Sequence, residues 1–172
     1  MTNLIITPKT KIYELLETYP DLEDVLITTA PQFKKLKNPV LRKTIARITS
    51  ISQAAVIAGI NTEELVNTLR KHVGQDRIET FVEGNNQYNT NCPEWFKNEY
   101  VIDTIDVSEM LNKGEQPVHE VLSRLNKLKK NEIIKIIAPF IPAPLIDKTI
   151  SLQYLHWLKE ISAGEYHVYL KK

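Results

Sequence analysis

The chain has 172 residues, of which 42% are hydrophobic and 25% are charged, a composition typical of a folded protein with one or two small domains. Its formal net charge of +1 supplies no global field that would attract it to nucleic acid or to an anionic membrane. No apolar run approaches the roughly 20 residues that cross a bilayer, and no secretory signal is visible at the amino terminus, so we expect a cytoplasmic protein.

Residues 1–74 predict a small all-α domain in which short helices are separated by stop signals. Apolar side chains recur at helical spacing after Thr10 and again after Asp21, which can cap the second helix. Asn38 and Pro39 have the pattern of a helix cap followed by a first-turn proline. The helix that follows them should bury Val40, Leu41, Ile45 and Ile48.

Two further helices are predicted by capping-box spacings, Ser50 to Gln53 and Asn61 to Glu64, with Gly59 at the expected stop between them. This stretch could also form a DNA-binding helix-turn-helix. The second helix, however, would begin with the carboxylates Glu63 and Glu64, which would repel phosphate oxygens. We therefore expect ordinary helix packing here and no nucleic-acid partner.

Residues 75–98 predict a linker between two domains. The stretch from Gly84 to Asn91 is polar and rich in asparagine. Trp95 and Phe96 differ from it, because two adjacent aromatic side chains are seldom left in water. We expect these two aromatic residues to dock on one of the domains.

Residues 99–172 alternate between strand and helix patterns. A first strand is predicted by Val101, Ile102, Ile105 and Val107, and Pro117 should open a helix. An isoleucine-rich strand from Ile133 to Ile137 runs into a turn with prolines at 139, 142 and 144. A short helix through Leu145, Ile146 and Ile150 should follow.

Two more strands, His156 to Ser162 and Tyr166 to Leu170, complete the order βαβαββ. Right-handed crossovers would place both helices on one face of a mixed sheet. The predicted fold class is α+β, an all-α domain followed by a two-layer α/β sandwich.

The second half resembles the TusA/SirA-like superfamily, and more closely its cysteine-less relatives of unknown function. The resemblance lies in residues 105–111, residues 114–117, the turn at residues 140–145 and the terminal hairpin. The sulfur carriers hold a persulfide on a cysteine where this chain has Gly114-Glu115-Gln116-Pro117, so the resemblance implies no sulfur transfer. Relatives often have histidine where this chain has Gln116, so it implies no metal or haem either.

The first half resembles a small helical domain of unknown function that is found beside hybrid-cluster proteins and in ScdA-type iron–sulfur repair proteins. The matching residues are 19–26, 33–41 and 50–69. That domain often has cysteines after its second helix, where this chain reads Thr28-Thr29-Ala30-Pro31-Gln32-Phe33. The resemblance therefore links the chain to redox, sulfur or iron–sulfur metabolism without supplying a cluster ligand.

Reactive and metal-binding groups are sparse in the sequence. The single cysteine, Cys92, cannot form an internal disulfide and lacks the helix amino terminus that would lower a thiol pKa. We expect an unreactive linker cysteine, with a thiol-based carrier or enzyme as the alternative. No two histidines have the helical spacing of a metal site, so we expect no metal and no cofactor.

A basic run near residues 34–47 offers a second surface, because Lys34, Lys35 and Lys37 lie in a span without acids. A solvated helix face is the expected role, and a nucleic-acid-binding regulator is the alternative function.

The sequence favours a non-catalytic binding or sensing module. We expect a partner protein or a small ligand to dock around Gln116, His119, Phe140 and Pro142, with Asp147 nearby. The helical domain would fix the partner or a second copy in a homo-oligomer. No catalytic residue is expected.

Overall fold

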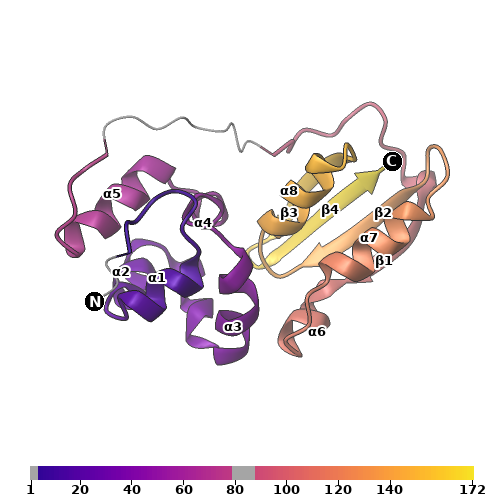
Figure 1. Ribbon diagram of the computed structural model, residues 1–172. Coiled ribbons are helices and arrows are strands. Elements are labelled where there is room, and N and C mark those ends of the chain that lie inside the picture. Colours follow the sequence, from indigo (N-terminus) through magenta and orange to yellow (C-terminus); the bar gives the residue numbers. More distant parts are fainter. Residues whose placement is uncertain (1–3, 79–87) are drawn as a thin grey trace. The chain divides into compact units, whose positions relative to one another are not determined.

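The computed structural model describes residues 4–78 and 88–172 of the chain. Two compact units are present, unit 1 (Met1–Asn86) and unit 2 (Gln87–Lys172), and each is described by itself (Figure 1). Residues 79–87 of the predicted linker lie outside the described residues. Residues 75–78 and 88–98, which the same prediction also assigned to the linker, lie in unit 1 and unit 2 respectively.

Unit 1 is helical where it is described. Its elements are α1 (Ile12–Thr18), α2 (Leu22–Thr29), the 3-10 helix η1 (Pro31–Lys37), α3 (Pro39–Ile48), α4 (Ile51–Ala58) and α5 (Thr62–His72). The sequence did not predict η1, because a 3-10 turn has no apolar periodicity of its own.

Three predicted caps form as expected. The side chain of Asn38 accepts hydrogen bonds from the first turn of α3, Ser50 and Gln53 complete a capping box on α4, and Asn61 accepts from the Glu64 amide. Asp21 was predicted to cap α2, but its side chain makes no capping bond because its backbone is already in the helical region.

The core of unit 1 is formed by α1, α2, α4 and α5, with Phe33 from η1. The large side chains that are fully buried include Ile6, Leu15, Leu16, Leu22, Leu26, Ile51, Leu65 and Leu69. The sequence overestimated the burial of α3. Val40 is 38% exposed and Leu41, Ile45 and Ile48 are half-buried, while Ala46 is the buried residue of this helix.

The two ends of unit 1 are held together by polar side chains. Gln75 donates to the carbonyl of Leu4 at 2.7 Å and accepts from the amide of Ile6 at 3.0 Å. Asn67 of α5 bonds both the amide and the carbonyl of Ile78, at 2.9 and 3.2 Å. Arg70 donates to the Ile6 carbonyl at 2.6 Å. The folded unit therefore includes the residues that follow α5.

Unit 2 contains a mixed four-stranded sheet in the order β1-β2-β4-β3. Its elements are η2 (Asn98–Tyr100), β1 (Val101–Asp106), α6 (Val107–Asn112), α7 (Val118–Asn126), β2 (Ile133–Ala138), α8 (Ala143–Ser151), β3 (Leu155–Ser162) and β4 (Glu165–Lys171). Strand β2 pairs in parallel with β1 and antiparallel with β4, and β3 pairs antiparallel with β4. With unit 1, this arrangement confirms the predicted α+β fold class.

The first strand ends earlier than predicted. Val107 was assigned to it, but Val107 begins α6, a short helix that the sequence reading missed. The carboxylate of Asp106 accepts a hydrogen bond from the Ser108 amide and so caps this helix. The strand pattern and the helix cap overlap here, and the cap ends the strand.

Both faces of the sheet are covered. Helices α7 and α8 lie over one face (Figure 1), above the buried residues Ile134, Ile136, Val168 and Leu170. Residues 88–100, which we call the strap, start beside α8 and β3 and then cover part of the other face. Trp95, Phe96 and Tyr100 of the strap pack against Ile133, Trp157 and Tyr169. Among the described residues, no helix combines the length and the apolar character needed to cross a membrane.

Candidate functional site

The residues that were expected to form a docking surface around the proline turn differ in their exposure to solvent. Gln116 and His119 are exposed at the start of α7. Phe140 and Pro142 are buried, with Phe140 at 9% exposure. The prolines stop β2 and begin α8; Pro142 is buried, and Pro139 and Pro144 are half-buried.

Asp147 binds the strap. The sequence suggested that Asp147 caps or solvates α8, but it lies within the helix, and its Oδ1 accepts a 2.8 Å hydrogen bond from the Tyr88 hydroxyl. Burial, followed by the Asp147 carboxylate, raises the pKa of Tyr88 and keeps it a hydrogen-bond donor.

His156 of β3 completes this polar cluster. Its Nε2 accepts a hydrogen bond from the Asn89 amide at 2.9 Å, and its ring meets the Tyr88 ring edge-on, with the centroids 5.9 Å apart. Burial lowers the pKa of His156, and the Asp147 carboxylate partly opposes this shift. In its neutral form, His156 therefore accepts a hydrogen bond that helps to hold the strap in place.

Cys92 is exposed on the strap, next to an aromatic cluster. Its Sγ lies 4.0 Å from the Pro93 carbonyl oxygen. Below it, Trp157 and Tyr169 stack with centroids 4.9 Å apart, and Phe96 packs edge-on against both rings. No basic side chain within residues 88–172 is hydrogen-bonded to this thiol. The cluster fixes the strap on the sheet and brings no base to Cys92.

The basic run of unit 1 lies on η1 and α3. Lys34, Lys35 and Lys37 are exposed. Arg42, from the same run, is paired with Glu23 at 2.6 Å, and the Arg47 guanidinium lies 4.7 Å from the centre of the Tyr13 ring. Part of the predicted charge is therefore used within unit 1.

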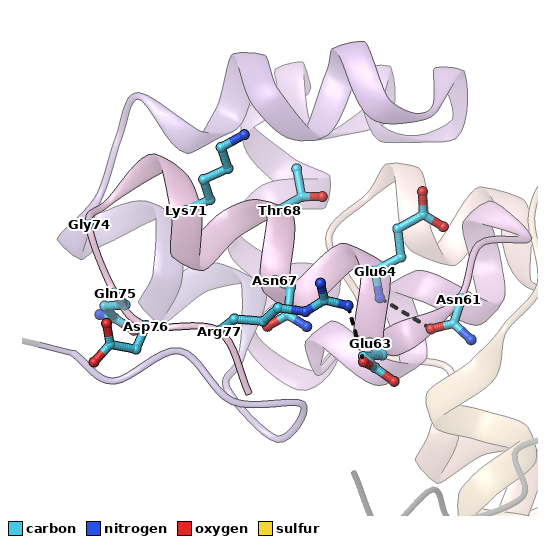
Figure 2. Close-up of a pocket in the computed structure, with 10 residues that line it drawn as sticks. All are labelled: Asn61, Glu63, Glu64, Asn67, Thr68, Lys71, Gly74, Gln75, Asp76 and Arg77. Carbon is cyan, nitrogen blue, oxygen red and sulfur yellow. Dashed lines mark hydrogen bonds and ion pairs between the residues drawn. The ribbon is translucent and has the colours of Figure 1, made fainter. Parts of the chain in front are cut away.

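Helix α5 and the segment after it border a polar hollow of about 790 Å³ (Figure 2). Its lining carries both signs of charge, including Glu63 and Arg77, whose side chains approach to 3.7 Å. Asn67 and Gln75 also line it, but their amides hold the ends of the unit together. The sequence reading missed this hollow, which the return of residues 74–77 alongside α5 creates. Because acidic and basic side chains both line the hollow, it favours neither an anionic nor a cationic ligand.

A smaller hollow of about 330 Å³ lies between α2 and α5, lined by Asp24, Val25, Thr28, Thr29, Thr68 and His72. The Thr28 and Thr29 hydroxyls both donate to carbonyl oxygens one turn earlier in α2. Within residues 4–78 and 88–172, no three His, Cys, Asp or Glu side chains are close enough to hold a metal ion.

One end of unit 2 gathers apolar and cationic side chains that the sequence reading did not connect. Strand β2 begins at this end, and β4 ends there. Lys171 of β4 lies between Ile133 of β2 on one side and Leu155 of β3 on the other. The loop before β3 meets the end of α7 there, because the Tyr154 hydroxyl donates to Asn126 Oδ1 at 2.9 Å. We call this region the lysine–aliphatic end; it comprises Lys127, Lys129, Lys130, Ile150, Leu152, Leu155, Lys171 and Lys172.

The aliphatic side chains of this end face solvent. Ile150, Leu152 and Leu155 are 43%, 47% and 45% exposed. Ile150 was expected to belong to the apolar face of its helix, but it lies in the last turn of α8, beyond the part that packs on the sheet. Three such residues within six positions form a cluster of the kind that marks interaction surfaces.

Two backbone features shape the same end. Asn131 has φ 74° and Gln153 has φ 65°, both in the left-handed region. Asparagine often adopts this conformation, whereas glutamine seldom does. The turn at Gln153 connects Leu152 to β3 and thus separates two of the exposed leucines. Such strain is often kept where a loop has a function.

Comparison with known proteins finds a relationship for unit 1. Residues 6–66 match the model of a domain of unknown function, DUF1858. The match runs from Ile6 into α5 and stops just before Asn67, so it leaves out the residues that close the unit. It supports the expected helical domain of unknown function and does not reach unit 2. No curated protein and no solved structure matches the chain.

Proposed function

We propose that this protein is a non-catalytic binding module and that it docks a partner protein through the lysine–aliphatic end of unit 2. The observation that carries the proposal is that Ile150, Leu152 and Leu155 are each nearly half exposed beside a group of lysines. These lysines make no ion pair within the described part of the chain. Apolar contact would supply affinity, and the lysines would supply orientation and rate of encounter.

Two titratable side chains of unit 2 are used in hydrogen bonds within the fold, which supports a non-catalytic role. Asp147 and His156 are both hydrogen-bonded to the strap. A general acid or base must instead reach a proton of its substrate. The hydrogen bonds of Asp147 and His156 stabilise the fold of unit 2. We therefore propose that unit 2 acts through recognition at its surface.

The order of elements in unit 2 supports a relationship to the cysteine-less TusA/SirA-like proteins. A parallel β1–β2 pair followed by a terminal β3–β4 hairpin agrees with the βαβαββ order. Gln116 belongs to residues 114–117, which correspond to the segment that carries the reactive cysteine in the sulfur carriers. Because this chain has no cysteine there, we propose binding in place of sulfur transfer. A single, exposed cysteine also suits the reducing cytoplasm that we propose as its location.

Unit 1 would take part by fixing the partner or a second copy of the chain. Its exposed Lys34, Lys35 and Lys37 support this role, because they present a cationic surface on η1. This contribution is secondary, since Arg42 is already paired with Glu23.

Site-specific photocrosslinking in cells tests the docking surface. The full chain carries a benzophenone amino acid in place of Leu152, and a matched protein carries it in place of Ile161, which is 43% exposed at the other end of β3. The proposal expects a protein adduct of defined mass from position 152 that position 161 does not give. Equal labelling at both positions, or no adduct at either, would refute it.

A further inference from the structure

The lysine–aliphatic end has two chemically different halves. The aliphatic half is formed by the end of α8 and the start of β3. The cationic half is formed by the loop before β2 and by the end of β4. Since β4 lies between β2 and β3 in the sheet, the two halves adjoin each other. A ligand that uses the whole end must therefore present apolar and anionic groups side by side.

The lysines of the cationic half make no ion pair with any carboxylate among the described residues. Glu132 lies in the same loop, but its carboxylate accepts a 2.7 Å hydrogen bond from the Lys129 amide and stabilises the turn. Lys127, Lys129 and Lys130 are exposed, and the Lys171 ammonium lies 5.9 Å from the centre of the Trp95 ring. Lys127, Lys129 and Lys130 are therefore accessible to an outside partner.

We infer that the occupant is an acidic amphipathic helix of a partner protein. This inference rests on the proposed function, namely that a partner protein docks at this end. An amphipathic helix carries an apolar stripe with charged residues along its border. Its stripe would cover Ile150 and Leu152, and its carboxylates would face Lys127 and Lys130. Charge complementarity selects an acidic helix over a neutral or basic one.

Other anionic occupants fit this surface less well. A single-stranded nucleic acid would use aromatic side chains for base stacking, whereas Ile150 and Leu152 are aliphatic. A lipid bilayer is a broad apolar layer beneath a charged surface, so it favours aliphatic side chains that are surrounded by cations. Here the lysines lie to one side, toward β2 and β4.

A designed peptide tests the inference on the full chain. The probe is a fluorescent helix of about 18 residues, or five turns, with a leucine stripe bordered by glutamates. A second peptide has the same composition in scrambled order, without a stripe. Binding is measured by fluorescence anisotropy. Vesicles with anionic phospholipid, and a single-stranded oligonucleotide, are tested in parallel by sedimentation and anisotropy.

The paired variant Ile150→Gln with Leu152→Gln tests the aliphatic half, and Ile161→Gln is its control. We expect the pair to weaken binding about tenfold or more, because two partly exposed aliphatic contacts are lost. The variant Lys127→Gln with Lys130→Gln should weaken binding and reduce its dependence on salt. Its control, Lys9→Gln with Lys71→Gln, has the same change in net charge at exposed positions of unit 1 and should bind like the parent.

Three results would overturn the inference. The scrambled peptide could bind as tightly as the amphipathic one, the two control variants could lose as much affinity as the test variants, or vesicles or oligonucleotide could bind more tightly than the peptide. If the acidic helix fails while Leu152 still crosslinks to a protein in cells, the inference is wrong and the proposed function stands. If position 152 gives no specific adduct, the proposed function itself fails.

Discussion

The Tyr88 hydroxyl donates a 2.8 Å hydrogen bond to Asp147, and this contact ties the start of the strap to α8. The next residue of the strap, Asn89, is held by β3 in two ways. Its amide donates to His156 Nε2, and its carbonyl accepts from the Leu158 amide at 2.8 Å. The strap is therefore anchored before Trp95 and Phe96 reach the sheet, so its attachment and the aromatic cluster should depend on each other.

The change Tyr88→Phe should lower the free energy of unfolding of unit 2. It keeps the buried ring but leaves Asp147 without this donor, which costs about 1–2 kcal/mol. Tryptophan fluorescence during urea denaturation measures the effect, because Trp95 and Trp157 both lie in unit 2. Tyr166→Phe is the control, since that hydroxyl is 3.4 Å from Glu160 in an exposed contact. An equal loss in both variants would contradict the anchor.

His156 should make the stability of unit 2 depend on pH. Burial lowers its pKa, so at mildly acidic pH the unfolded chain binds a proton that the folded chain resists. This contribution is present above the ordinary histidine pKa of about 6.5 and is lost as the pH falls below that value.

The variant His156→Gln keeps an acceptor for the Asn89 amide and cannot titrate. We expect its urea midpoint to fall less than that of the parent between about pH 8 and pH 5.5, the range in which an ordinary histidine titrates. His119→Gln, at an exposed position on α7, should follow the parent curve. A His156→Gln curve parallel to the parent would show that His156 does not control this dependence.

The change Asn67→Ala should loosen both ends of unit 1. It removes two hydrogen bonds to the backbone of Ile78, which costs about 1–2 kcal/mol in total. Hydrogen exchange followed by mass spectrometry should show faster exchange in residues 4–6 and 75–78. Lys71→Ala, an exposed change on the same helix, should leave that exchange unchanged. Unaltered protection in Asn67→Ala would mean that the DUF1858 region closes without these residues.

The change Gln153→Gly should stabilise unit 2, because glycine adopts the left-handed φ of 65° without the cost that a side chain incurs. The expected gain is up to about 1 kcal/mol, set by relief of that strain and reduced by the greater entropy of the unfolded glycine. Asn131→Gly should gain less, since asparagine tolerates its φ of 74°. Urea midpoints of the two variants give the comparison. A loss of stability in Gln153→Gly would show that its backbone is not strained.

Local signals in the sequence predicted most helix boundaries of unit 1. Asn38, Ser50 and Asn61 cap the helices that follow them, because a cap needs a side chain within a few residues of the amides it binds. The same logic failed at Asp21, whose backbone is already helical. The burial of α3 was also misjudged, since periodicity shows which face is apolar but not how much of that face a neighbour covers.

Local signals in the sequence predicted the candidate site less well than the helix boundaries. Phe140 and Pro142 were expected beside a docking surface because their turn is rigid and apolar and carries no reactive group, but both side chains are buried. The lysines before β2 and at the end of β4 are about forty residues apart in the sequence. They come to one end of the sheet through the β2–β4 register, which no local pattern reveals.

The sequence by itself determined the α+β class, the order of the four strands with α7 and α8 in unit 2 and the principal caps of unit 1, because these follow from periodicity and from contacts between near neighbours. Tertiary structure decided which of those residues are available for function. It buried Phe140, bound Asp147 to Tyr88 and left Leu152 exposed, since each outcome depends on packing between segments distant in the chain.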